Sequence, residues 1–121
     1  MKKVTLDDKF RLFDQVWTPK IVAAANGQLV KLAKGEGTLV WHTHEHEDEL
    51  FLVVFGKLTI AMETHTVDLL PGELFVVPRG TAHCPTATPG TRFLMIEPET
   101  CSHTGAEKTV LTVNIEDQEW I

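Results

Sequence analysis

The pattern of hydrophobic and polar positions predicts one helix, near the start of the chain, over residues 5–17. Apolar side chains recur there three or four positions apart, as one face of a helix requires: Leu6, Phe10, Phe13 and Trp17. Thr5 is the expected N-cap, because its hydroxyl can accept a hydrogen bond from the first turn. Asp7 and Asp8 follow in that turn, where the helix dipole favours acidic groups. Pro19 then marks the end of the helix.

Beyond Pro19 the apolar positions form short runs of strand length. Turn-forming residues separate the runs, and Asn26-Gly27 is the strongest hairpin signal among them. Strands are predicted at residues 21–25, 28–34, 38–44, 50–55, 57–63, 65–70, 73–78, 82–87, 91–97 and 108–115, with a loop over 98–108. Short strands at near-even spacing predict an all-β sandwich or barrel. We expect one barrel domain over residues 19–121 and a helical arm over residues 1–18.

Composition and charge narrow the classes of partner. The chain has 121 residues, 43% of them hydrophobic and 23% charged, which is typical of one soluble globular domain. Its formal charge is −6, and its lysines and arginines form no basic run. Nucleic acids and anionic membrane surfaces are bound through clustered positive charge, so we expect neither as a partner.

The chain is expected to be cytoplasmic. No stretch approaches the roughly 18 apolar residues that span a bilayer, and charged residues interrupt any apolar segment behind the two N-terminal lysines. Cys84 and Cys101 are therefore expected to be reduced thiols.

Candidate metal ligands gather around the sequence His42-Thr43-His44. In a strand, residues two positions apart point to the same face, so both imidazoles can reach one ion. Glu49 follows a polar stretch that can turn the chain back toward them, and His83 arrives from far along the sequence. Three imidazoles and one carboxylate suit a divalent Zn, Fe, Mn, Ni, Co or Cu ion. A six-coordinate ion would keep two positions for water or substrate.

His46 is a rival of Glu49 for this site, because it shares the parity of His42 and His44 if the strand continues. The acidic run EHEDE is more typical of a turn, which favours Glu49 and leaves His46 at the rim. His46 could still move protons there, since its unperturbed pKa lies near neutrality. His46 and Glu49 are therefore the candidate catalytic residues.

Two separated blocks of the sequence resemble the two motifs of the cupin superfamily. The first is GTLVWHTHEHEDELFLVVFG, which begins at Gly37, and the second is GELFVVPRGTAH, which begins at Gly72. The resemblance implies a cupin-type double-stranded β-helix, or jelly-roll barrel. It assigns the family's metal ligands to four positions: His42, His44, Glu49 and His83. The chain is also similar to small bacterial cupins described as mannose-6-phosphate isomerase-like, and small cupins often form dimers, so we expect a homodimer.

Two positions depart from the family pattern. Gly37 leaves four residues before His42 where the family usually has five, which affects a turn rather than the ligands. Ala87 stands where the second motif often has asparagine, and parity from His83 places it in the same interior. A small apolar group there removes a hydrogen-bond donor to substrate, so the resemblance does not assign a reaction.

The interior around the ligands is expected to be apolar. Parity from Glu49 points Phe51 and Val53 inward. Parity places four other residues on the opposite face: Trp41, Leu50, Leu52 and Cys84. An apolar pocket beside a metal favours a small, partly apolar ligand with a metal-chelating oxygen over a bare sugar.

The leading functional hypothesis is a metal-dependent enzyme that acts on a small organic substrate. Two histidines and a carboxylate are the ligands of non-haem iron oxygenases, so oxygenase chemistry comes first. Metal-assisted isomerisation or decarboxylation, a lyase reaction, comes next, with Glu49 or His46 moving protons. The alternative is a non-catalytic module that binds or senses a small molecule. A structural metal ranks third, because structural zinc is usually closed by four ligands and rich in cysteine.

Overall fold

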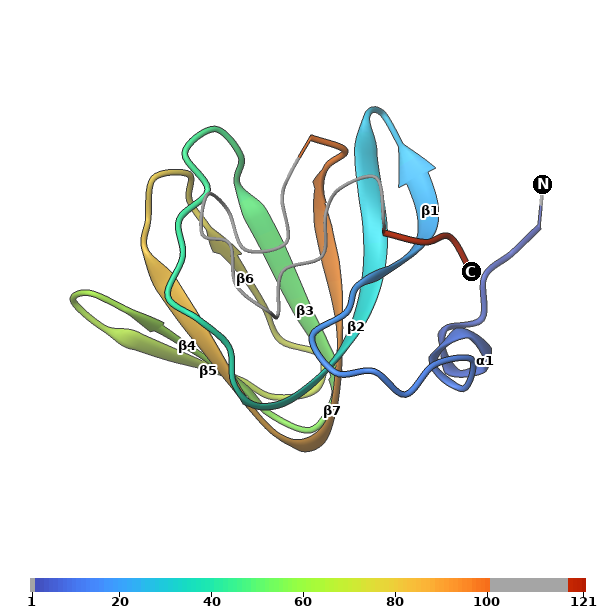
Figure 1. The fold of residues 1–121 in the computed structure, drawn as a ribbon, viewed down its shortest axis with the longest axis horizontal. Coiled ribbons are helices and arrows are strands. Elements are labelled where there is room, and N and C mark those ends of the chain that lie inside the picture. Colours follow the sequence, from blue (N-terminus) through green and yellow to red (C-terminus); the bar gives the residue numbers. More distant parts are fainter. Residues whose placement is uncertain (1, 101–117) are drawn as a thin grey trace.

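One short helix and seven antiparallel strands make up residues 2–100 and 118–121, which the computed structural model describes (Figure 1). In chain order they are α1 (Leu6–Phe10), β1 (Lys20–Ala25), β2 (Gln28–Thr38), β3 (Glu49–Phe55), β4 (Leu58–Met62), β5 (Thr66–Leu69), β6 (Leu74–Val77) and β7 (His83–Pro98). The predicted strand at 108–115 and Cys101 lie outside the described residues. Within these residues, no helix is long and apolar enough to cross a membrane.

The longest strand, β7, connects the two halves of the fold. Its N-terminal half pairs with β4, its C-terminal half pairs with β3, and β2 runs beside both halves. The strand order is β1-β2-β7-β3-β6, and β5 pairs with β4 on the other side. Figure 1 shows β7 bending at the bottom of the view. The partner of β7 changes from β4 to β3 between Ala87 and Arg92, and Gly90 within this stretch has a φ of 81°. This bend lets the strands close over one interior, which confirms the predicted all-β jelly roll.

The main hydrophobic core fills that interior. Residues of β3 and β4 alternate between buried and half-buried, so every second side chain points into the core. Phe51 and Val53 are only 3% and 1% exposed, which confirms the inward parity predicted from Glu49. Other members of the core include Leu58, Ile60, Leu69, Val77, Phe93 and Met95. Removing this apolar surface from water is the main force that holds the strands together.

A second, smaller cluster lies on the outer face of β1 and β2. Phe10 of α1 and Phe13 pack there against Val22 and Leu32. The helix is therefore a cover for one side of the sheet, and it lies away from the interior in Figure 1.

The helix is shorter than its apolar periodicity predicts. It ends at Phe10 and not at residue 17, and Thr5 makes no side-chain capping hydrogen bond. The helix is short because the apolar residues after Phe10 pack on opposite faces of the sheet. Phe13 belongs to the outer cluster, whereas Trp17 belongs to the interior core. Trp17 has a φ of 54°, and its Nε1 donates to the carbonyl oxygen of Glu36 at 3.0 Å. A continuous helix would keep both aromatic rings on one side.

Two predicted strand boundaries are also wrong. The strand β2 ends at Thr38, so most of the predicted strand 38–44 lies in an irregular segment. The predicted strands 82–87 and 91–97 form a single strand, because β7 bends at Gly90 while its pairing with β2 continues on both sides.

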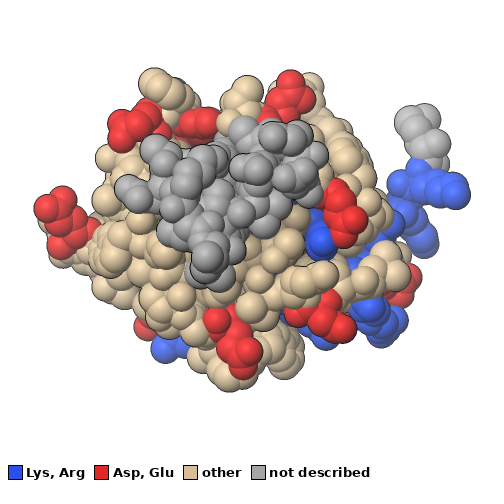
Figure 2. All heavy atoms as spheres, viewed as in Figure 1, with Lys and Arg blue, Asp and Glu red and all other residues tan. Residues whose placement is uncertain are grey.

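Charged side chains are mixed over the face drawn in Figure 2. Acidic residues are spread around the rim of this face, and basic residues gather mainly beside the N-terminal segment. On this face the described residues form no continuous basic surface, in keeping with the negative charge of the chain.

Candidate metal centre

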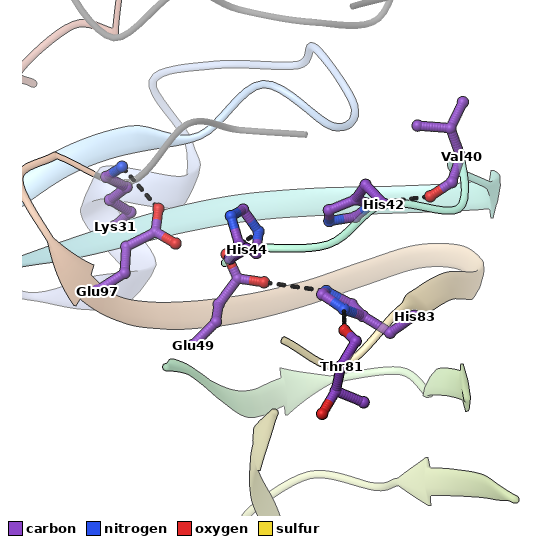
Figure 3. Close-up of polar contacts among 8 residues, drawn as sticks. All are labelled: Lys31, Val40, His42, His44, Glu49, Thr81, His83 and Glu97. Atoms are coloured by element: carbon purple, nitrogen blue, oxygen red, sulfur yellow. Dashed lines mark hydrogen bonds and ion pairs between the residues drawn. The ribbon is translucent and has the colours of Figure 1, made fainter. Parts of the chain in front are cut away.

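Four buried side chains converge inside the jelly roll: His42, His44, Glu49 and His83 (Figure 3). Each offers one ligand atom, and these four atoms all lie within 4.8 Å of one another. The side chains belong to residues that are between 0% and 4% exposed. The first two come from the segment between β2 and β3, the glutamate begins β3, and the third histidine begins β7. The structure thus brings together the four residues that the sequence singled out.

Backbone hydrogen bonds join the two sequence blocks. His42 and His83 form an isolated antiparallel bridge, in which each N–H donates to the other's carbonyl oxygen at 3.0 Å. The N–H of Gly80 donates to the carbonyl oxygen of His44 at 2.8 Å. Burial alternates across this stretch, since Thr43 is less buried than the histidines on either side. The two imidazoles therefore share one face although the predicted strand is absent.

An exposed ion pair links the same two segments from outside. The carboxylate of Asp48 accepts hydrogen bonds from the backbone N–H of Arg79 at 2.9 Å and from its Nε at 3.2 Å. These hydrogen bonds and the guanidinium charge lower the pKa of Asp48. Asp48 precedes Glu49, and Arg79 lies in the turn that leads to His83. The pair thus ties together the chain segments that carry two of the four converging groups.

The histidine tautomers are set by backbone carbonyl groups. Nδ1 of His42 lies 2.8 Å from the carbonyl oxygen of Val40, and Nδ1 of His83 lies 2.9 Å from that of Thr81. A carbonyl oxygen can only accept, so each Nδ1 carries a hydrogen. In the neutral rings Nε2 is then left with its lone pair, which is the form that binds a metal.

The distances in this group fit one metal ion. Nε2 of His44 lies 3.3 Å from Oε2 of Glu49, and Nε2 of His83 lies 3.4 Å from Oε1 of Glu49. Nitrogen and oxygen ligands bind such ions at about 2.0–2.2 Å, which places neighbouring ligand atoms about 3.0–3.5 Å apart. The group can therefore hold an ion with small adjustments of its side chains.

Burial and neighbouring charges set the protonation of the group. Burial, with the added effect of His83, lowers the pKa of His42 to about 4, so this ring is neutral at pH 7. Burial also acts to lower the pKa of His44, but the hydrogen bond and charge of Glu49 outweigh it and raise this pKa overall. Burial acts to raise the pKa of Glu49, yet the contacts of its carboxylate with Glu97, His44 and His83 outweigh burial and hold the pKa well below its usual value. The centre thus holds an ionised carboxylate.

Sequence reasoning missed a buried charged pair behind Glu49. Nζ of Lys31 donates to Oε1 of Glu97 at 2.7 Å, and the two residues are 1% and 0% exposed. Burial and the charge of Glu49 raise the pKa of Glu97 well above its usual value. Strand parity could have found the pair, because Glu97 lies two positions after the core residue Met95. A charged residue at such a position is unusual enough to mark a site.

Three other residues singled out in the sequence lie outside the group of four. His46 is exposed, so of the two rivals only Glu49 offers a ligand atom to the group. Ala87 is 5% exposed and belongs to the interior core, as its parity predicts. Cys84 is buried, and its Sγ donates to the carbonyl oxygen of Leu39 at 3.7 Å.

A narrow cavity of about 20 Å³ adjoins the group. This is room for about one molecule of the size of water. His42 and Glu49 contribute its polar part, and most of the remaining wall is apolar: Trp17, Leu39, Phe51, Phe93 and Met95. The space beside the converging ligands is therefore small and largely apolar.

The chain is similar to a known domain family and to proteins of two bacteria. Residues 28–97 match the family model described as Cupin domain. A cupin-2 domain containing protein from Shewanella frigidimarina NCIMB 400 has a solved structure that is 41% identical, with a TM-score of 0.77 over 78% of this chain and 93% of that chain. The uncharacterized protein YdbB from Bacillus subtilis (strain 168) is 34% identical over 98 residues, which are 80% of this chain and 79% of the relative.

A hydroquinone 1,2-dioxygenase from Sphingomonas sp. TTNP3, solved with 4-hydroxybenzoate bound, is more distant. It is 17% identical, with a TM-score of 0.72 over 78% of this chain and 31% of that chain. At this identity the likeness is one of fold alone.

Proposed function

The chain belongs to the cupin domain family, and on that premise we propose that it is a metal-dependent enzyme acting on a small organic molecule. The residues that would hold the metal ion are His42, His44, Glu49 and His83. One observation carries the proposal: Nε2 of His83 and Oε1 of Glu49 are both buried acceptors and face each other across 3.4 Å. Two buried acceptors in this arrangement are stabilised when a cation lies between them.

The donor set suits a divalent Zn, Fe, Mn, Ni, Co or Cu ion. When bound, such an ion would supply Lewis-acid or redox chemistry at this group of side chains. The protein's own contribution is orientation: the carbonyl groups of Val40 and Thr81 hold the His42 and His83 rings with Nε2 available. The cavity beside them has room for a molecule as small as water or dioxygen. The donor set includes the two histidines and one carboxylate of non-haem iron oxygenases, which supports oxygenase chemistry first and isomerase or lyase chemistry second.

The cavity wall supports a small, partly apolar substrate. Phe51, Phe93 and Met95 line the space beside the ligand group with apolar surface, whereas a bare sugar would need polar side chains to match its hydroxyl groups. The remaining expectations stay predictions: a homodimer, a cytoplasmic location, no nucleic-acid or membrane partner, a proton-moving role for His46, and the mannose-6-phosphate isomerase-like subgroup.

Metal analysis followed by oxygen uptake tests the proposed reaction class. We expect protein purified without added metal to retain a first-row ion, and the iron-loaded protein to consume oxygen with catechols or small enolisable acids. The matched control is H44A, which should show no substrate-dependent uptake after the same iron treatment. Tightly bound zinc together with an absence of uptake would contradict the oxygenase proposal. Tight ligand binding without turnover would favour the alternative, a binding or sensing module.

Metal affinity is expected to fall when the solution is acidified. The raised pKa of His44 means that protons compete for this ligand from near neutral pH downward. His42 adds competition only near pH 4, because its pKa is lowered to about 4. Calorimetric titration with Zn²⁺ at several pH values should show a loss of about tenfold or more per pH unit below about pH 6. Constant affinity between pH 8 and pH 5 would indicate a site made of carboxylates alone.

A further inference from the structure

The buried pair of Lys31 and Glu97 lies directly behind the candidate metal centre (Figure 3). Lys31 comes from β2 and Glu97 from β7, at positions whose neighbours on the same face are the core residues Ala33 and Met95. Burying an ion pair costs desolvation free energy, and apolar residues of similar size often serve stability equally well. The pair therefore calls for an explanation other than folding stability.

Glu97 faces the carboxyl group of Glu49. Oε1 of Glu97 accepts from Lys31 at 2.7 Å, while Oε2 is buried and has no hydrogen-bond partner among the described residues. The register of β3 and β7 pairs Leu50 with Ile96, so Glu49 and Glu97 are cross-strand neighbours on the same face. Their carboxyl groups act on each other: Glu97 lowers the pKa of Glu49, and Glu49 raises the pKa of Glu97. The two oxygens of Glu49 in turn face His44 and His83, at 3.3 Å and 3.4 Å. Glu49 is thus held on one side by Glu97, with the histidines on its other side.

We propose that Glu97, anchored by Lys31, is a positioning residue that orients the Glu49 carboxylate for metal binding. The inference rests on the proposed function, since it assumes that the four converging residues bind a metal. Glu97 does not touch the ion itself and acts only through Glu49. Partners that orient a ligand in this way typically contribute 10–100-fold to metal affinity.

Substitutions at Glu97 separate positioning from simple burial. In E97L the polar contact with Glu49 is lost while the side chain keeps a similar size, and we expect Zn²⁺ affinity to fall about 10–100-fold. In E97Q the amide nitrogen can donate to Glu49 and the amide oxygen can accept from Lys31, so affinity should stay within about threefold of wild type. E97D keeps a carboxyl group but shortens its reach, and K31M removes the anchor, so both should weaken binding.

A matched control is available in a second lysine–glutamate pair. Lys20 binds Glu119 and also lies near the ring of Phe13, in the outer part of the fold. K20M should lower thermal stability and leave the Zn²⁺ dissociation constant unchanged. The spectrum of bound Cu²⁺ in electron paramagnetic resonance gives a second readout, because it reports ligand orientation. It should change in E97L and K31M, and it should not change in K20M.

The outcomes distinguish the inference from the proposed function. If wild-type protein binds no metal, the proposed function fails. If wild type binds metal and E97L binds it equally well, or if E97Q is as weak as E97L, the positioning role is wrong. If E97L does not fold, the other three variants test the positioning role. The role is supported if E97D and K31M lose Zn²⁺ affinity while E97Q keeps it. Wild-type affinity in E97D and K31M would overturn it.

Discussion

Replacing His83 with alanine is expected to abolish the binding of one metal ion per chain. His83 is 0% exposed, and its Nε2 faces Oε1 of Glu49 at 3.4 Å. Four-ligand zinc sites have apparent binding free energies of about 10–16 kcal/mol, so losing one ligand should weaken binding on the order of a hundredfold or more. The metal-to-protein ratio after desalting, measured by mass spectrometry of the elements, should fall from about one to near zero. Calorimetric titration gives the change in dissociation constant.

Two further variants make this result specific. H46A should keep the full metal-to-protein ratio, because His46 is exposed and outside the converging group. H44A should lose metal as H83A does, which covers the case in which the cavity left at position 83 disturbs folding. Melting curves recorded with a chelator present separate loss of fold from loss of metal. Full occupancy in H44A or in a folded H83A would show that the ligand set is wrong.

Replacing Gly56 with alanine is expected to lower the free energy of unfolding by about 2–5 kcal/mol. Gly56 has a φ of 84°, where an added Cβ costs about 1–2 kcal/mol. That Cβ would also lie 2.5 Å from Oγ1 and 2.8 Å from Cα of Thr91, and relieving such overpacking costs about 1–3 kcal/mol. Thr91 is 0% exposed, and its hydroxyl donates to the carbonyl oxygen of Thr88 at 2.7 Å. The clash thus falls on the bend of β7 that closes the jelly roll.

The control for Gly56 is Gly72. Its φ of 86° is nearly the same, but an added Cβ would have no atom within 4 Å. G72A should therefore lose only about 1–2 kcal/mol, the conformational part of the effect. Urea denaturation followed by circular dichroism measures both variants. Equal losses would show that the contact with Thr91 has little energetic weight.

Local patterns in the sequence were enough to predict much of the fold. Asn26-Gly27 predicts the turn between β1 and β2, and both residues have positive φ values of 53° and 77° there. Strand parity predicts that Phe51 and Val53 point inward, as observed. These features depend on neighbouring residues, because the alternation of side chains and the conformational preferences of turns act over a few positions.

The candidate site was predictable as a set of residues but not as a geometry. The resemblance of the two blocks to the cupin motifs, together with strand parity, singled out the four side chains that converge. The predicted strand at 38–44 is wrong. A single antiparallel bridge between His42 and His83 joins the two sequence blocks in its place. A strand pattern predicts which side chains share a face, and the extended segment from His42 to His44 keeps that parity without strand pairing.

The sequence by itself therefore determined the all-β class, the parity of the interior and the identity of the four converging side chains. Only the tertiary structure decided that the helix ends at Phe10, because Trp17 packs in the interior core and not on the outer face of the sheet. The tertiary structure also brings Lys31 into contact with Glu97, which is 66 positions away, and places this pair beside Glu49. Periodicity is set by near neighbours, whereas these contacts depend on the register of strands that are distant in sequence, and no local pattern specifies that register.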